Sequence, residues 1–255
     1  MYAHNTYIDK LRLIRSENTF VATICCVFLS CETDYKRLVQ YLHTQECKYY
    51  KNLKFEKRIR SYLIGRFAAK RAIAALIEEN NLKDIAIEYG IFNQPLIAFN
   101  KKNIQVSITH CDDFGAAIAY PEGHPMGIDI EKINMDHIDV LERNITADEK
   151  EKIDSCPFSY ETGLTLLWTA KEALSKILKT GLMTSFEVFE VSRIELYDNF
   201  TICYYKNFAQ YKVASFTIGS YMVSVAYPLR TNIQFDIAAI REKFTFTKSL
   251  DDNLA

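Results

Sequence analysis

The sequence predicts an α+β protein made of two similar halves, each with one long helix on a small antiparallel sheet. Three observations lead to this prediction. Helical periodicity runs from about 55 to 80 and again from about 160 to 179. Segments rich in β-branched and aromatic residues, which favour strands, follow each helical stretch. Short motifs of the first half also recur in the second half.

The recurring motifs keep their order and nearly their spacing. A-K-R-A-I at 69–73 corresponds to A-K-E-A-L at 170–174, and both lie within the predicted long helices. S-I-T followed by A-I-A-Y-P, within 107–121, corresponds to S-F-T followed by S-V-A-Y-P, within 215–228. Each half would bury one face of its sheet under its helix. We therefore expect the halves to pack with pseudo-twofold symmetry and to leave a cleft that suits a ligand.

The domain boundary is expected in the turn-rich stretch P-E-G-H-P at 121–125. This placement gives an N-terminal half over 1–122 and a C-terminal half over 123–230. The remainder, 231–255, is expected to be a C-terminal extension.

Local signals define further elements in chain order. The apolar run at 20–29 is much shorter than the roughly 20 residues that span a bilayer, so it predicts a buried strand. Thr146 and Glu149 form a capping-box pattern, which predicts a helix from there to about Ile153. Gly181 follows the second long helix and is expected to be its left-handed C-terminal residue.

Composition excludes several functional classes. The net charge is −1, so no general basic field would attract nucleic acid or an anionic membrane. An anionic ligand must therefore be held by a local cluster of positive groups. The seven cysteines are odd in number and contain no C-x-x-C pair, which favours reduced thiols in the cytoplasm. We see no cleavable signal peptide at the N-terminus.

The run G-I-D-I-E at 127–131 is the first candidate site. In a strand, Asp129 and Glu131 would share one face while the isoleucines take the other. Two neighbouring acids repel each other unless a cation or solvent compensates. An isolated D-x-E is also typical of a solvent-facing edge strand, but Gly127 and the apolar flanks favour a strand near the centre of the fold.

The second long helix supplies a third acid. In W-T-A-K-E-A-L-S-K at 168–176, the helical spacing brings Trp168, Glu172 and Lys176 to one face. Glu172 and Lys176 could form an ordinary surface pair, yet the only tryptophan of the chain on the same face indicates burial. Three carboxylates without histidine or cysteine favour a hard cation, namely Mg²⁺ or else Mn²⁺.

These two runs together resemble the paired signature of the 4′-phosphopantetheinyl transferase superfamily. Its motifs are G-[IV]-D-[IV]-E and [FW]-x-x-K-E-[AS]-x-x-K, and the two-half organisation is similar to its surfactin-synthetase-activating type. The resemblance spans about 48 to 227. It implies transfer of the 4′-phosphopantetheine arm of coenzyme A to a serine of an acyl or peptidyl carrier protein, with release of adenosine 3′,5′-bisphosphate.

The resemblance also implies roles for single residues of the second half. Asp129, Glu131 and Glu172 would be the metal ligands, and Glu172 would also be the general base, directly or through water. Lys176 would neutralise charge on the pyrophosphate, and Lys171 would contribute to coenzyme A binding nearby. Two similar halves in one chain make a monomer the expected state.

The first half would hold the nucleotide end of coenzyme A. S-I-T-H-C at 107–111 resembles the family's S-[IL]-[ST]-H-[ST] element, so His110 and Thr109 would contact the nucleotide. Arg58 and Arg66 match positions expected to reach phosphates, for which the planar guanidinium is suited. The run N-Q-P at 93–95 departs from the family's G-[KE]-P, so a charged contact is expected to be missing at Gln94.

Two other functions remain open at this point. The same acids could serve a magnesium-dependent phosphodiester or nucleotide hydrolase. Alternatively, the chain could be a non-catalytic module that binds coenzyme A, although such a module has no need of the full set Asp129, Glu131, Glu172 and Lys176.

Overall fold

The computed structural model describes residues 6–29, 34–98, 103–136, 138–181 and 184–245. These residues divide into two compact units. The first unit consists of Met1–Pro125 together with Thr231–Phe235, and the second of Met126–Arg230 together with Asp236–Ala255. The chain therefore changes unit after Pro125, returns to the first unit at Thr231, and leaves it again after Phe235. Nothing in the sequence indicated this short return.

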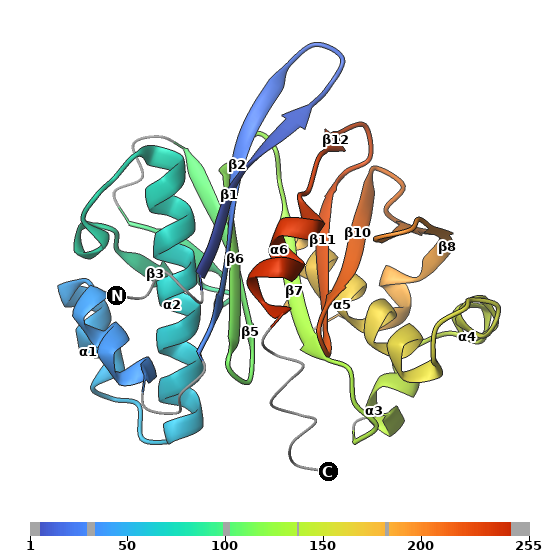
Figure 1. Ribbon diagram of the computed structural model, residues 1–255, viewed down its shortest axis with the longest axis horizontal. Coiled ribbons are helices and arrows are strands. Elements are labelled where there is room, and N and C mark those ends of the chain that lie inside the picture. The colour runs from blue at the N-terminus through green and yellow to red at the C-terminus, as the bar shows by residue number, and fades with distance from the viewer. Residues whose placement is uncertain (1–5, 30–33, 99–102, 137, 182–183, 246–255) are drawn as a thin grey trace. The chain divides into compact units, whose positions relative to one another are not determined.

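The first unit contains a long helix, α2 (Glu56–Ile77), packed along a five-stranded antiparallel sheet (Figure 1). The strand order is β12-β1-β2-β6-β5. The strands are β1 (Thr6–Ile14), β2 (Thr19–Phe28), β5 (Ile104–Cys111), β6 (Phe114–Pro121) and β12 (Asn232–Ile233). The smaller elements are the 3-10 helices η2 (Asp34–Tyr41) and η3 (Leu82–Asp84), helix α1 (Thr44–Tyr50), and the hairpin of β3 (Ile87–Tyr89) and β4 (Pro95–Ile97).

Small residues let α2 lie close to its sheet. Ala68, Ala69 and Ala72 are fully buried on the helix and pack in one core cluster with Cys25 and Ala117 of the sheet. Because every second strand residue faces the helix, this cluster takes alternate residues of β2 and β6.

The second unit has the same plan. Helix α5 (Tyr160–Leu178) packs on a five-stranded antiparallel sheet of order β7-β11-β10-β9-β8 (Figure 1). The strands are β7 (Gly127–Lys132), β8 (Val191–Leu196), β9 (Thr201–Tyr205), β10 (Tyr211–Ile218) and β11 (Tyr221–Pro228). The smaller elements are helices α3 (Ile138–Glu142), α4 (Ala147–Asp154) and α6 (Ile237–Lys243), and the 3-10 helix η5 (Phe186–Phe189).

The α+β prediction is confirmed, with one long helix on an antiparallel sheet in each unit. The apolar run at 20–29 forms most of β2, as predicted. The capping box is also confirmed, because the Thr146 side chain accepts from Glu149 N and the Glu149 carboxylate accepts from Thr146 N.

One prediction was wrong in detail. The left-handed residue that ends α5 is Lys179, with φ 56°, and not Gly181. The helix stops two residues earlier than the glycine suggested, and Gly181 takes a second left-handed position in the following turn, with φ 55°.

A search for membrane spans gives a negative result for the part of the chain that the structure describes: none of its helices is both long and apolar enough to cross a bilayer.

Candidate functional site

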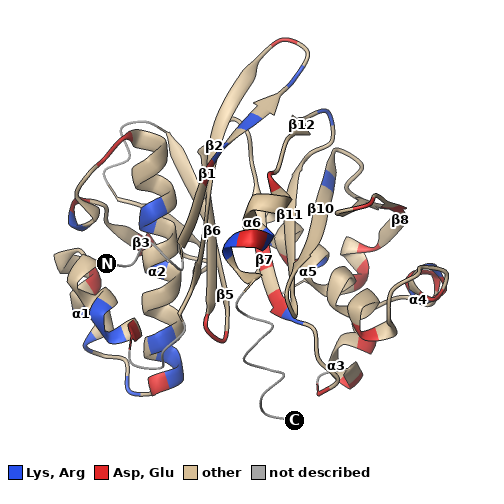
Figure 2. Cartoon of the chain, in the orientation of Figure 1, with Lys and Arg blue, Asp and Glu red and all other residues tan. Residues whose placement is uncertain are grey.

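The candidate site of the second unit is formed where β7 passes under α5. Gly127, at the start of β7, has no room for a side chain, because an added Cβ would overlap the carbonyl oxygen of Ala173 on α5. This close approach brings the alternate residues Asp129 and Glu131 to the side of the sheet that α5 covers. Acidic residues stand out in red on β7 in Figure 2.

Asp129 and Lys176 form the central ion pair. Asp129 is 4% exposed, and its Oδ1 lies 2.7 Å from Lys176 Nζ. The same ammonium donates to the carbonyl oxygen of Ile128 at 2.8 Å. Since a buried carboxylate is costly without a positive partner, the Lys176 ammonium offsets the cost of burying Asp129.

Glu172 lies beside this pair. Burial, and next the Asp129 carboxylate, raise the pKa of Glu172, and Lys176 opposes the shift. Its Oε1 is buried and accepts no hydrogen bond from any residue that the structure describes. A half-buried carboxyl group that has a raised pKa and a spare acceptor atom can serve as a proton acceptor or as a cation ligand.

Glu131 is two residues beyond Asp129 on the same face of β7 and is half-buried. Within the described ranges, however, no three His, Cys, Asp or Glu side chains are close enough together to hold a metal ion. The structure therefore brings together Asp129, Glu172 and Lys176, and places Glu131 next to them along the strand without closing a three-carboxylate cluster.

A row of buried hydroxyl groups lies beside Asp129 and was not predicted. Ser224 of β11 is the register partner of Asp129. Its Oγ lies 2.7 Å from Thr169 Oγ1 on α5 and 2.7 Å from Ser215 Oγ on β10. The only sequence signal was polar residues within otherwise apolar strands. These hydroxyls satisfy one another and tie α5 to the sheet next to the acids.

Lys171 is not with the other site residues. Its ammonium lies 2.6 Å from Glu149 Oε2 and donates to the carbonyl oxygen of Asn144 at 2.9 Å. The side chains of Lys171 and Glu149 are 1% and 0% exposed. The structure thus assigns Lys171 to a buried ion pair, and identifies Glu149 as a partner that its capping pattern alone could not reveal.

In the first unit, Arg66 lies inside an aromatic cluster. Its guanidinium carbon is 5.1 Å from the centre of the Tyr62 ring and 4.6 Å from that of Tyr89. Its Nε is 3.7 Å from Glu46 Oε1, and the side chain is 4% exposed. Stacking between two rings and charge from Glu46 make Arg66 part of the core of this unit.

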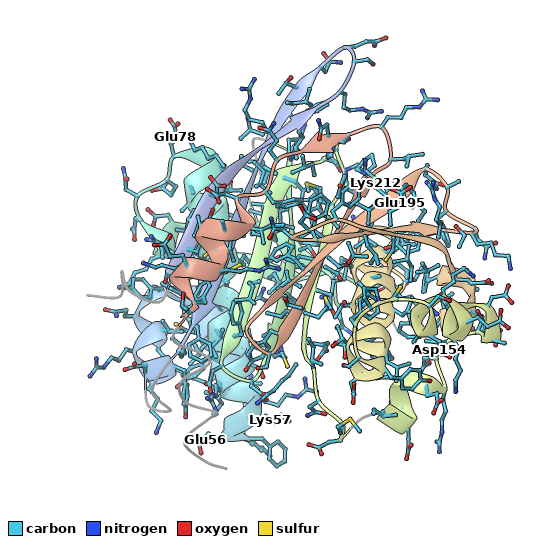
Figure 3. All side chains as sticks on the ribbon, turned by 45° about the vertical axis from the view of Figure 1, so that its right-hand side comes forward. Glu56, Lys57, Glu78, Asp154, Glu195 and Lys212 are labelled. Atoms are coloured by element: carbon cyan, nitrogen blue, oxygen red, sulfur yellow. The ribbon has the colours of Figure 1, made fainter. Side chains whose placement is uncertain are left out.

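Arg58 is exposed at the first turn of α2. Figure 3 labels its neighbours Glu56 and Lys57 at this end of the helix, and Figure 2 shows mostly basic residues there. Burial raises the pKa of Tyr89, while Arg66 and, more weakly, Arg58 lower it, so both guanidinium groups act on this tyrosine.

Thr109 and His110 point to opposite faces of β5, since they are neighbours in one strand. Thr109 is buried and His110 is exposed. His110 is on the α2 side, where Gly65 leaves room: an added Cβ there would lie 3.7 Å from His110 Cδ2. The structure therefore does not place the two side chains on one surface of the sheet.

Gln94 fixes the turn between β3 and β4. Its side-chain oxygen accepts from Phe92 N at 2.9 Å, and its carbonyl oxygen accepts from Gly90 N at 2.8 Å. A lysine at this position could not accept the first of these bonds. Gln94 thus has a local structural role in this turn.

Residues 125–226 match the family model of the 4′-phosphopantetheinyl transferase superfamily. This segment contains both motifs on which the resemblance was based, together with β7 and α5. For this part of the chain the resemblance is confirmed at the level of the superfamily. The surfactin-synthetase-activating type remains a prediction.

Two curated relatives are the enterobactin synthase component D of Escherichia coli O157:H7 and that of Shigella flexneri. Each is 28% identical over an alignment of 153 positions, and the alignment covers 57% of this chain. The match spans 64% of the length of each relative.

Solved structures with local similarity include two synthases. The holo-(acyl-carrier-protein) synthase from Bacillus anthracis, solved in complex with CoA (3′,5′-ADP), is 20% identical, with a TM-score of 0.32 over 46% of this chain and 94% of its own. The holo-[acyl-carrier-protein] synthase of Thermotoga maritima is 18% identical, with a TM-score of 0.30 over 56% and 75%.

Proposed function

We propose that this protein transfers the 4′-phosphopantetheine arm of coenzyme A to a serine of an apo carrier protein and releases adenosine 3′,5′-bisphosphate. The observation that carries the proposal is the meeting of Asp129, Glu172 and Lys176 between β7 and α5, within the segment that matches the superfamily model. Each of these residues has a role in phosphoryl transfer that its surroundings support.

Glu172 is the proposed general base. A serine hydroxyl is a weak nucleophile and needs a proton acceptor within hydrogen-bond reach. The raised pKa of Glu172, caused first by burial and then by Asp129, makes it a stronger base than an ordinary surface glutamate. Its unused Oε1 is the atom that would accept the proton, directly or from an intervening water.

Lys176 is the proposed partner of the phosphate charge. Its ammonium is fixed by Asp129 and by the Ile128 carbonyl oxygen, so it costs little to order when an anionic substrate arrives. The leaving group is a nucleotide phosphate, on which negative charge grows as the bond breaks.

Asp129, Glu131 and Glu172 are the proposed ligands of a Mg²⁺ ion, for which Mn²⁺ could substitute. Oxygen donors alone fit a hard cation. Because a carboxylate bound to a metal is a poor base, Glu172 would take the serine proton through an intervening water while the ion is bound. When bound, such an ion would neutralise phosphate oxygens and stabilise their charge in the transition state. The gathering of the three carboxylates around one ion is itself part of this proposal.

The first unit is proposed to bind the nucleotide end of coenzyme A. Arg58, exposed at the start of α2, and His110, exposed on β5, are its strongest candidates. Arg66 and Thr109 are buried and would act by supporting the surface rather than by reaching the ligand themselves.

Intact-mass measurement tests the proposal. The protein is mixed with coenzyme A, Mg²⁺ and a panel of apo carrier proteins, which should include one from a synthase of the kind named for the curated relatives. We expect a carrier to gain the mass of one phosphopantetheine arm. Consumption of coenzyme A without any carrier would instead indicate a hydrolase, and binding without turnover a non-catalytic module.

A further inference from the structure

One buried carboxylate joins three elements of the second unit. Glu149 Oε2 accepts from Thr146 N at the start of α4, and it lies 2.6 Å from Lys171 Nζ of α5. Glu149 Oε1 accepts from Val191 N, the first residue of β8, at 2.7 Å. The Glu149 side chain is 0% exposed, and both of its carboxylate oxygens accept hydrogen bonds inside the protein.

The first unit repeats this arrangement with different residues. Glu46 Oε2 accepts from His43 N at the start of α1 and lies 2.5 Å from Lys70 Nζ of α2. Glu46 Oε1 accepts from Ile87 N, the first residue of β3, at 3.3 Å. In each unit, therefore, a glutamate in the first turn of a short helix binds the buried lysine of the long helix and the start of a strand.

The residue after each lysine occupies an equivalent place. In the second unit this residue is Glu172, which interacts electrostatically with Asp129 of β7. In the first unit it is Arg71, which interacts electrostatically with Cys25 of β2. Cys25 pairs with Ala117 on β6 as Asp129 pairs with Ser224 on β11, so the strand positions also correspond.

We infer that the Glu149–Lys171 pair is a positioning device, which holds α5 so that Glu172 faces Asp129, and that Lys171 makes no contact with coenzyme A. The inference rests on the proposed function of Glu172. A fixed lysine sets both the rotation of the helix and its height above the sheet at that turn. The residue next to it then has little freedom to move away from the strand.

Burial supports this role over ligand binding. The Lys171 ammonium is inside the protein and already has two oxygen partners, Glu149 Oε2 and the Asn144 carbonyl oxygen. To reach a phosphate, it would have to leave a carboxylate that stays buried without its charge partner, which is strongly unfavourable. Lys176, five residues along the helix, differs because a quarter of its side chain is exposed while its ammonium stays paired with Asp129.

The internal repeat supplies a matched control. Lys171→Met removes the buried ammonium that pairs with Glu149, and Lys70→Met removes the one that pairs with Glu46. Only the first substitution lies next to Glu172. Both variants should lose thermal stability by comparable amounts. Lys171→Met should lower kcat about 10- to 100-fold, as seen when groups that orient catalytic ligands are removed, with KM for coenzyme A unchanged. Lys70→Met should keep the wild-type kcat.

Fluorescence of Trp168 gives a readout that does not depend on activity. This tryptophan, one helical turn before Lys171, stacks on Phe186 of η5 with ring centres 4.8 Å apart. Glu149 contacts both α5 and β8, the strand that follows η5. Loss of the Glu149–Lys171 contact in Lys171→Met should therefore change the Trp168 emission. The emission should stay unchanged in Lys70→Met.

Three results would overturn the inference: a wild-type kcat in Lys171→Met, a raised KM with kcat unchanged, or an equal loss of kcat in Lys70→Met. If Lys171→Met does not fold, Glu149→Gln/Lys171→Met leaves no buried charge unpaired and decides by the same criteria. Failure of the proposed function would look different, since the wild-type protein itself would then modify no carrier.

Discussion

Glu172 combines two properties that seldom occur together on a helix, namely burial and the nearness of another carboxylate. Both raise its pKa, and neither has a structural benefit, because they oppose the charged form that prevails in neutral water. Such an arrangement is typical of functional sites, where stability is lower than the fold could achieve. The proposed reaction therefore depends on Glu172, the group that would take the proton.

We expect Glu172→Gln to lower kcat by about 10²- to 10⁴-fold, the usual contribution of a general base. At saturating Mg²⁺, KM for coenzyme A should change little, because an amide keeps the shape of the side chain. Steady-state kinetics on an apo carrier protein would measure both constants. Glu151→Gln, at an exposed position of α4, is the matched control and should behave as the wild type. A change in KM alone would remove the base role.

The two arginines of α2 should respond differently to substitution. Arg66→Ala should destabilise the protein by about 1–3 kcal/mol, since the buried guanidinium stacks on Tyr62 and Tyr89. Arg58→Ala should leave the melting temperature unchanged and raise KM for coenzyme A. Thermal melts and kinetics of both variants would check this. An unchanged melting temperature for Arg66→Ala would contradict its placement in the core.

At the scale of elements, the site depends on the close packing of β7 against α5. Gly127 makes this packing possible, because only a residue without Cβ fits under the Ala173 carbonyl oxygen. The strand then brings Asp129 to the side that the helix covers, two residues further along. A small error in this packing would move Asp129 away from Glu172 and Lys176 together.

Gly127→Ala should therefore destabilise the protein by about 1–3 kcal/mol, as expected for overpacking, and should reduce turnover further than the loss of folded protein explains. Gly123→Ala is the control, since an added Cβ there meets nothing within 4 Å. Turnover corrected for the folded fraction is the measurement. Equal effects of the two substitutions would show that the spacing of β7 and α5 does not matter.

The sequence predicted these elements well and the contacts between them only in part. Periodicity located both long helices, and alternation identified Asp129 on a strand, because these patterns are local. No local pattern shows that the Lys171 ammonium meets Glu149 across two helices. The separation of Thr109 from His110 follows from strand geometry and was obscured by treating the S-x-[ST]-H motif as one unit.

At the scale of the whole molecule, two units share one plan and differ in chemistry. The strand and helix positions of Asp129 and Glu172 correspond to Cys25 and Arg71 in the first unit. A thiol and a guanidinium offer no oxygen ligands to a hard cation, so the acidic chemistry is confined to the second unit. The internal repeat was visible in the sequence, but only the strand register shows which residues of the first unit correspond to the acids.

A buried histidine lies inside the first unit, near the end of its longer segment. His124 Nε2 is 2.8 Å from Thr231 Oγ1, and the ring, with 0% exposed, lies next to Phe20. Burial lowers the pKa of His124 below its usual value of 6.5, and Arg15 adds to the effect.

This pKa shift predicts a loss of stability in acid. In the unfolded chain His124 takes up a proton as the pH falls below 6.5, while the folded protein does so only at lower pH. The contribution of neutral His124 to the free energy of unfolding is thus complete above pH 6.5, and it is lost as the pH falls toward the pKa of His124 in the folded protein. Melting temperatures of the wild type and of His124→Gln would measure it. Parallel pH curves for the two proteins would contradict the assignment.

We propose above that Asp129, Glu131 and Glu172 hold a single divalent ion beside Lys176. Calorimetric titration of Mg²⁺ into the protein, with coenzyme A present, tests this claim most directly. We expect one ion bound per wild-type chain and a large loss of Mg²⁺ affinity in Asp129→Asn and in Glu172→Gln. Equal affinities in the wild type and both variants would contradict it.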